Sequence, residues 1–100
     1  MENEVVKNLV PFKKWINAEK TINDSLTQLN TENILCRTIR LMAKSTNTNK
    51  IYIGSENLTS SNYSIFLDAN ESVDIEIDNI NKIFLIAVVN GEGVNYCYVI

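Results

Sequence analysis

The sequence predicts an all-β protein, a single antiparallel β-sandwich or jelly-roll-like domain of seven or eight short strands. Turn-forming residues recur at roughly ten-residue intervals, with no convincing long helix between them. Residues 72–78 alternate apolar and polar side chains, the two-residue period of a strand with one buried face and one solvated face. Residues 83–89 are apolar at every position, which indicates a strand that is covered on both faces.

The first 20 residues form the most ambiguous segment. Val5, Val6, Leu9 and Val10 would share one face of a short helix, but Pro11 ends it, and the following residues favour an extended chain. We therefore expect residues 1–20 to be an N-terminal arm or edge strand, and residues 21–100 to be the β-sandwich domain.

The remaining elements follow from alternating apolar residues and from the turns between them. Asn23-Asp24 marks a turn or bulge within residues 21–29. Residues 45–49 read as a hairpin connection, and Asn90-Gly91 gives the strongest hairpin signal of the chain. Tyr96 and Tyr98 share a face with Val94 and Ile100, which favours packing in the core. The strands after the first turn are expected at residues 34–44, 50–53, 62–67, 72–78, 82–89 and 94–100.

Charge is distributed unevenly along the chain. Residues 1–50 contain eight Lys and Arg against five Asp and Glu, a net charge of +3, whereas residues 51–100 contain one against seven, a net charge of −6. The acidic half can be a solvated sheet edge, or surfaces of opposite sign can bring identical subunits together head to tail. The pI of about 4.8 argues against nucleic acid as a partner. No apolar run is long enough to span a membrane, and residues 1–20 contain no continuous apolar stretch, so we expect no secretory signal.

No catalytic, metal-binding or cofactor-binding residues are expected. The chain has no His, which removes the commonest general base and metal ligand. Cys36 and Cys97 lack metal-ligand spacing and are expected to be buried thiols in a reducing compartment. The carboxylates at residues 74, 76 and 78 would lie in a row along one strand, about 6–7 Å apart, rather than surround one cation. The hydroxyls of residues 55–61 have no base beside them.

Four motifs follow one another in a fixed order: Cys36-Arg37 before an apolar strand, Ser45-Thr46-Asn47 before Ile51-Tyr52-Ile53-Gly54, Leu67 before Glu71-Ser72-Val73, and residues 78–84 leading to Ala87. In this order they resemble small accessory structural proteins of tailed bacteriophages. The resemblance covers about residues 21–100. Two turns depart from the pattern, since Ala69-Asn70 replaces Pro-Gly and Asn49 replaces Gly. Asn tolerates a positive φ better than other non-glycine residues, so both turns can form.

The resemblance implies a β-sandwich that self-associates into trimers or larger rings and binds a virion. We therefore expect a non-enzymatic capsid decoration or auxiliary protein, made and folded in the bacterial host cytoplasm, with itself and the major capsid or another virion protein as partners. Its localisation would be the virion, without nucleic acid or membrane contacts. The candidate interface residues are Val10, Phe12, Trp15, Ile16, Arg37, Arg40, Asp74, Glu76, Asp78, Phe84, Ile86 and Val88.

Two alternatives remain open at this stage. The chain can be a sugar- or receptor-binding module of a phage tail or fibre, with Tyr52 and Tyr63 as the foremost members of an aromatic platform that also draws on Trp15 and the two C-terminal tyrosines. It can also be a small host-directed binding protein, which predicts a monomer with one adhesive edge.

Overall fold

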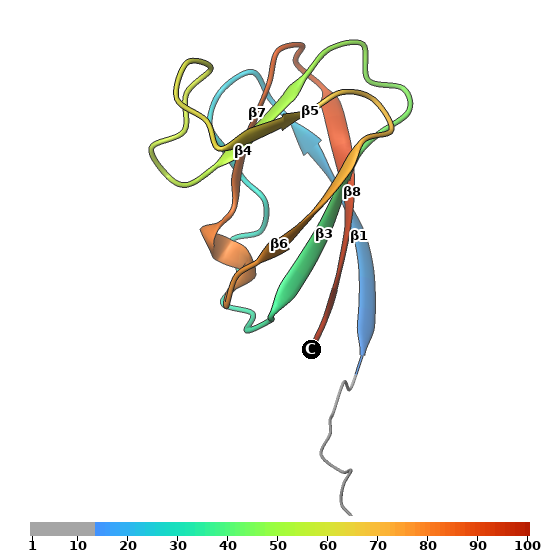
Figure 1. Cartoon of the computed structure of the whole chain (residues 1–100), viewed down its shortest axis with the longest axis vertical. Helices are drawn as coiled ribbons and strands as arrows, with labels where there is room; N and C mark the ends of the chain where they lie inside the picture. The colour runs from blue at the N-terminus through green and yellow to red at the C-terminus, as the bar shows by residue number, and fades with distance from the viewer. Residues whose placement is uncertain (1–13) are drawn as a thin grey trace, which may run out of the picture.

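Two four-stranded antiparallel sheets face each other and enclose the core (Figure 1). The computed structural model describes residues 14–100. The first sheet has the order β1-β8-β3-β6 and the second has the order β2-β7-β4-β5, which confirms the predicted all-β class. The strands are β1 (Trp15–Ile22), β2 (Thr27–Gln28), β3 (Thr38–Ala43), β4 (Ile51–Gly54), β5 (Ile65–Leu67), β6 (Ser72–Glu76), β7 (Phe84–Ala87) and β8 (Glu92–Val99), with a 3-10 turn, η1 (Ile80–Lys82), before β7.

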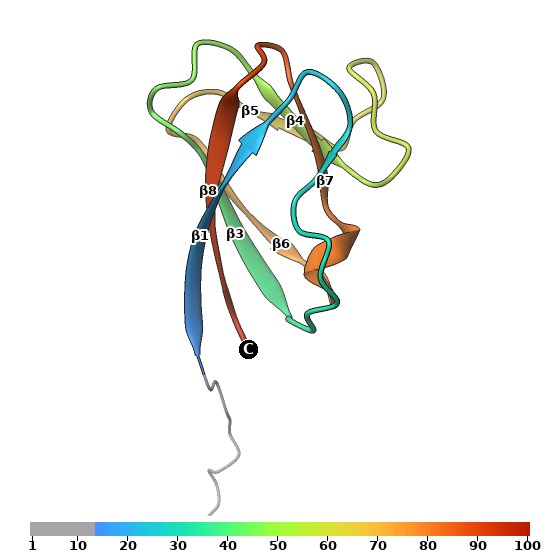
Figure 2. The same ribbon diagram turned by 180° about the vertical axis from the view of Figure 1, so that it is seen from behind.

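β1 is an edge strand of the first sheet, and β8 lies beside it along its whole length (Figure 2). In the pairing of β1 with β8, Trp15 lies opposite Val99 at one end and Ile22 lies opposite Glu92 at the other. The expected boundary after residue 20 therefore falls inside this strand. More exposed and less exposed residues alternate along β1, and Ile16 and Ala18 face the core while Trp15 faces solvent.

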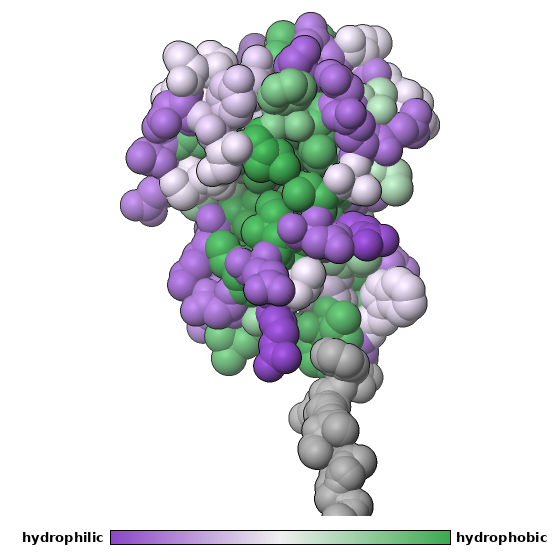
Figure 3. Space-filling model, viewed as in Figure 1, coloured by the Kyte–Doolittle hydropathy of each residue, from purple (hydrophilic) through white to green (hydrophobic). Residues whose placement is uncertain are grey.

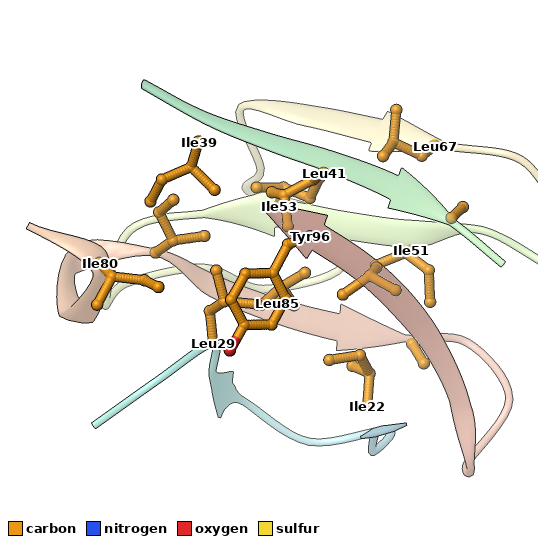
Figure 4. Close-up of a cluster of buried hydrophobic side chains, with 14 of the residues drawn as sticks. Ile22, Leu29, Ile39, Leu41, Ile51, Ile53, Leu67, Ile80, Leu85 and Tyr96 are labelled. Carbon is orange, nitrogen blue, oxygen red and sulfur yellow. The ribbon is translucent and has the colours of Figure 1, made fainter. Parts of the chain in front are cut away.

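Inward-facing aliphatic side chains from both sheets form one core (Figure 4). Ile39 and Leu41 on β3 meet Ile53 and Leu85 of the opposite sheet, and none of the four is more than 2% exposed. Such burial stabilises a fold by about 25 cal/mol per Å² of apolar surface. The tyrosines of β8 were predicted to pack, and they do: Tyr96 and Tyr98 are 7% and 5% exposed, with ring centroids 6.2 Å apart.

The two most informative segments of the sequence behave differently. β6 alternates as predicted, with Val73 and Ile75 turned inward and Ser72, Asp74 and Glu76 exposed. Residues 83–89 were predicted to be covered on both faces, and within the described residues only the inner face is fully covered. Leu85 and Ala87 point into the core, whereas Phe84 and Ile86 are half-buried on the outer side and Val88 and Val89 are exposed. No other part of residues 14–100 covers the outer side of β7 completely.

Both predicted hairpins are in fact corners between the sheets. Residues 45–49 carry the chain from β3 in the first sheet to β4 in the second, and Asn90-Gly91 joins β7 to β8 across the sandwich. The turn residues were identified correctly, since Gly91 has a φ of +91°. Asn70 has a φ of +70°, the positive φ that Asn was expected to tolerate at this turn, whereas Asn49 has no positive φ. Turn chemistry alone does not reveal whether the next strand stays in the same sheet.

The two cysteines are free thiols. They were predicted to be buried, but each is only half-buried. Cys97 lies on the outer side of β8, opposite Arg40 in the register. Cys36 precedes β3, and its Sγ donates a hydrogen bond of 3.3 Å to the carbonyl oxygen of Ile77. Burial raises the pKa of the Cys36 thiol, which disfavours the reactive thiolate.

Candidate interaction surface

Apolar side chains gather on the outer side of the second sheet. Tyr52 of β4 lies between Phe66 of β5 and Ile86 of β7, because it is the register partner of both. Tyr63 and Val88 extend this group from the segments that precede β5 and follow β7. We call these five residues the aromatic face. Their positions follow from strand alternation, since Ile51, Ile53, Leu85 and Leu67 point into the core.

The aromatic rings of this face contact one another. The ring centroids of Tyr52 and Tyr63 are 4.7 Å apart, and those of Tyr63 and Phe66 are 6.1 Å apart in an edge-to-face arrangement. The Nζ of Lys50 lies 5.0 Å from the centroid of Phe66, in cation–π range. Ser64 donates a main-chain hydrogen bond of 3.0 Å to Ile53, which fixes the segment carrying Tyr63 to β4. The rings therefore form an ordered surface before any partner arrives.

A shallow hollow of about 510 Å³ lies beside Tyr52 and Ile86. Its walls are mostly apolar, and Thr59 and Ser60 supply hydroxyl groups on one side. Asp24 is the single charged residue of its lining. The hollow is thus suited to an inserted apolar side chain or to a small ligand that combines an apolar face with hydroxyl groups.

A large part of this surface is open to solvent. Phe66, Tyr63 and Val88 are 39%, 43% and 44% exposed, and neighbouring Leu26 is 45% exposed. Scattered apolar residues are normal on a protein surface, whereas a contiguous group of contacting aromatic rings is a candidate interaction surface. Aromatic residues are enriched and charges are depleted at the centres of protein interfaces. The aromatic face has this composition.

The predicted interface residues are distributed over several surfaces. Ile86 and Val88 belong to the aromatic face, and Phe84 lies on the same outer side of β7. Trp15 is 75% exposed but lies on the outer side of the other sheet, and Ile16 points inward. Val10 and Phe12 lie outside the described residues. Tyr63 and Phe66 were not among the predicted interface residues, although Tyr63 was named with Tyr52 in the alternative aromatic platform. The alternation of residues 62–67 could have placed Phe66 on the outer side of its strand, but not beside Tyr52.

The predicted charged residues are largely paired within the chain. Arg40 Nε donates a 2.7 Å hydrogen bond to Asp74 Oδ1 across β3 and β6, and this bond lowers the pKa of the Asp74 carboxyl. Lys82 Nζ lies 2.7 Å from Asp78 Oδ1, and this hydrogen bond lowers the pKa of the Asp78 carboxyl. Glu76 and Arg37 are exposed, and no ion pair joins either to another residue of 14–100. Charges that are already paired contribute less to attraction between subunits.

Within residues 14–100, no three Cys, Asp or Glu side chains converge to hold an ion. None of these residues belongs to a helix that is long and apolar enough to cross a membrane.

Comparisons with known proteins found no match for this chain among protein-family models, curated proteins or solved structures. Of the surfaces described above, the aromatic face combines exposure, order and apolar character.

Proposed function

We propose that the protein is a non-enzymatic accessory structural protein of a bacteriophage virion, which attaches to the particle through its aromatic face. The partner would be the major capsid protein or another virion protein. One observation carries the proposal: Tyr52, Tyr63, Phe66, Ile86 and Val88 form a contiguous, exposed apolar surface on a sheet that a free subunit leaves uncovered.

The physical basis of attachment would be burial of this surface against the particle. Each Å² of apolar area that is removed from water contributes about 25 cal/mol before the costs of association. The interlocked rings of Tyr52, Tyr63 and Phe66 lower that cost because they are already ordered by their mutual contacts. The neighbouring hollow gives a partner side chain a place to insert, as in the centres of tight interfaces.

The proposal is tested by following the protein in particles from the host that carries its gene. Particles are banded in a density gradient, and an antibody against the chain locates it in the fractions. We expect the native chain to band with the particles. If it stays in the soluble fractions at every salt concentration, the virion proposal is wrong.

Two matched variants separate the aromatic face from the rest of the surface. Phe66→Asp places a carboxylate on the face, whereas Met42→Asp does the same on the outer side of the first sheet. Both side chains are 39% exposed, so the two substitutions perturb similar amounts of surface. We expect Phe66→Asp to leave the particle band and Met42→Asp to remain in it. Equal retention of both variants would exclude the aromatic face as the attachment surface.

A second candidate function is binding of a sugar or receptor as part of a tail or fibre. It is favoured by the hollow beside Tyr52, where one aromatic ring lies near the hydroxyls of Thr59 and Ser60 and the carboxylate of Asp24. Sugars bind by stacking on aromatic rings while their hydroxyl groups find polar partners. A glycan array with the native chain and the Tyr52→Ala variant tests this candidate. Binding that disappears in the variant would support it, and an array without signal would count against it.

A further inference from the structure

A second apolar feature lies at the open edge of the sandwich, between β5 and β6. Here the sheets part and leave a groove of about 260 Å³, whose walls are almost wholly apolar. Figure 3 shows apolar residues gathered in the middle of this face, between the positions of β5 and β6 in Figure 1, with polar residues around them. Its lining includes the isoleucines Ile53, Ile65, Ile75, Ile77 and Ile83. We call it the edge groove.

The side chains of the edge groove are incompletely covered. Ile75 and Ile77 on the β6 side and Ile65 on β5 remain half-buried, although all three point toward the core. The register partners of Ile75 and Ile65, which are Ile39 and Ile53, are no more than 2% exposed. The difference arises because β5 and β6 are both edge strands, so no described strand continues either sheet over the groove.

β6 also presents main-chain groups that can pair with a further strand. Ile77 donates its N–H to Arg37, and Glu71 accepts from Ala43, so the odd-numbered residues of this segment bond to β3. Because antiparallel bonding alternates, the N–H and C=O groups of the even-numbered residues point away from β3. Such a free edge is a template for strand addition, with alternate side chains of the added strand entering the adjacent groove.

We propose that the edge groove of one copy receives residues 5–12 of a second copy, which add to β6 as an extended strand. This inference rests on the proposed accessory function, since it describes how copies join to one another before or on the particle. Residues 5–12 carry five apolar side chains and no acidic one, and Pro11 is compatible with an added edge strand. Val10 and Phe12 are the side chains that would enter the groove.

Charge complementarity supports this occupant. Residues 5–14 carry Lys7, Lys13 and Lys14 without an acidic residue, a charge of +3. The exposed side of β6 and the residues after it carry Asp74, Glu76 and Asp78. Glu76 forms no ion pair with residues 14–100, so it is available to an incoming lysine. Opposite charges of this kind select the partner and its orientation.

The position of β1 explains why the donor is a second copy. β1 and β6 are the opposite edges of the first sheet, with β8 and β3 between them. To reach its own β6, the chain before Trp15 would cross about 14 Å at the end of the sheet, which takes about four or five residues. That crossing would use the segment containing Val10 and Phe12. A neighbouring copy can instead offer its groove directly to these side chains.

Photo-crosslinking of the full chain tests the inference. Phe12 is replaced by benzoyl-phenylalanine, and equal amounts of isotopically light and heavy protein are mixed, irradiated, digested and analysed by mass spectrometry. We expect crosslinks from position 12 to peptides containing Ile65, Ile75 or Ile77, with light–heavy hybrids that prove contact between copies. Crosslinks without hybrids, crosslinks to another surface, or no crosslinked dimer would each overturn the inference.

Two adjacent residues of β5 provide matched variants for the same experiment. Ile65 lines the edge groove, whereas Phe66 belongs to the aromatic face on the opposite side of the strand. We expect Ile65→Asp to reduce the hybrid crosslinks by about tenfold or more, because it puts a carboxylate into an apolar site. Phe66→Asp should leave them unchanged while it weakens attachment to particles. The crosslinks from position 12 are first mapped in the chain that keeps Ile65, so the test does not depend on the folding of Ile65→Asp.

The two proposals thus fail separately. Loss of particle binding with retained hybrid crosslinks would contradict the virion proposal alone. Particle binding without hybrid crosslinks at the groove would contradict the strand exchange alone.

Discussion

Asn47 fastens the β3–β4 connection to β8, and replacing it with Ala tests how this corner of the sandwich is held. Its Nδ2 donates a 2.9 Å hydrogen bond to the Gly93 carbonyl, and its Oδ1 accepts a 3.0 Å hydrogen bond from the Gly93 N–H. Asn47 is 8% exposed and Gly93 is also buried, so water cannot replace these bonds freely. The side-chain amide of Asn47 thus forms with Gly93 the two hydrogen bonds that a paired strand residue would form through its main chain.

The cost of Asn47→Ala follows from what each Gly93 group retains. The carbonyl of Gly93 still accepts from the Lys44 N–H at 3.1 Å, so its loss is one ordinary hydrogen bond, about 1 kcal/mol. The N–H of Gly93 loses its acceptor, and a buried unsatisfied donor costs about 1–3 kcal/mol. We expect a loss of about 2–4 kcal/mol in the free energy of unfolding. For a domain of this size, that corresponds to a fall in Tm of about 10–30 °C.

Urea denaturation followed by far-UV circular dichroism measures this loss. Fluorescence is a poor probe, because the single Trp, Trp15, is 75% exposed in the folded state. The control is Thr46→Ala, an exposed position in the same connection, which should change stability by less than about 0.5 kcal/mol. If Asn47→Ala falls within that same limit, the paired amide does not fasten the corner and the reasoning is refuted.

Three further substitutions have expected outcomes. Gly93→Ala would place its Cβ 2.8 Å from the Lys20 carbonyl oxygen, so we expect a loss of about 1–3 kcal/mol in urea denaturation as β1 is displaced. Glu92 accepts hydrogen bonds from the β3–β4 connection, which lower its pKa, so its stabilisation is complete above the ordinary Glu pKa and is lost as pH falls through the lowered value. Between pH 7 and pH 3, the Tm should therefore fall less steeply for Glu92→Gln than for the native chain. Equal slopes of Tm against pH would contradict this role of Glu92. Arg40→Ala should leave the urea denaturation midpoint nearly unchanged, because the Arg40 and Asp74 side chains are 61% and 51% exposed; a clearly lower midpoint would mean that the exposed pair is a major source of stability.

The strand content was predictable because local alternation records which face of a strand is buried. Ile39 and Leu41, and likewise Val73 and Ile75, alternate with polar or exposed residues and turn inward as expected. Asn70 has the positive φ that the turn requires. These features depend on residues close together in sequence.

The sheet assignment of the strands was not predictable in the same way. Asn90-Gly91 marks a turn, but the following strand pairs with β1 and β3 rather than with β7. Pairing partners are decided by distant segments, as shown by Trp15 opposite Val99. The extent of β1 was missed because polar residues alternate with small or single apolar ones, a weak signal beside the apolar runs elsewhere.

The candidate surface was predictable in part. The apolar run of residues 83–89 signalled that a second face needs cover, and the structure leaves Ile86 and Val88 on the uncovered side. The run itself did not show which neighbours complete that side. Tyr63 and Phe66 join it because β5 happens to pair with β4, a contact that no local pattern of the sequence specifies.

Hydroxyl-radical footprinting of Tyr63 and Phe66 tests the central claim most directly. The two rings are 43% and 39% exposed in the free chain and should be oxidised readily there. We predict that both are strongly protected when the chain is bound to particles, while Met42 on the outer side of the first sheet reacts at the same rate in both samples. Unchanged oxidation of Tyr63 and Phe66 on the particle would contradict attachment through the aromatic face.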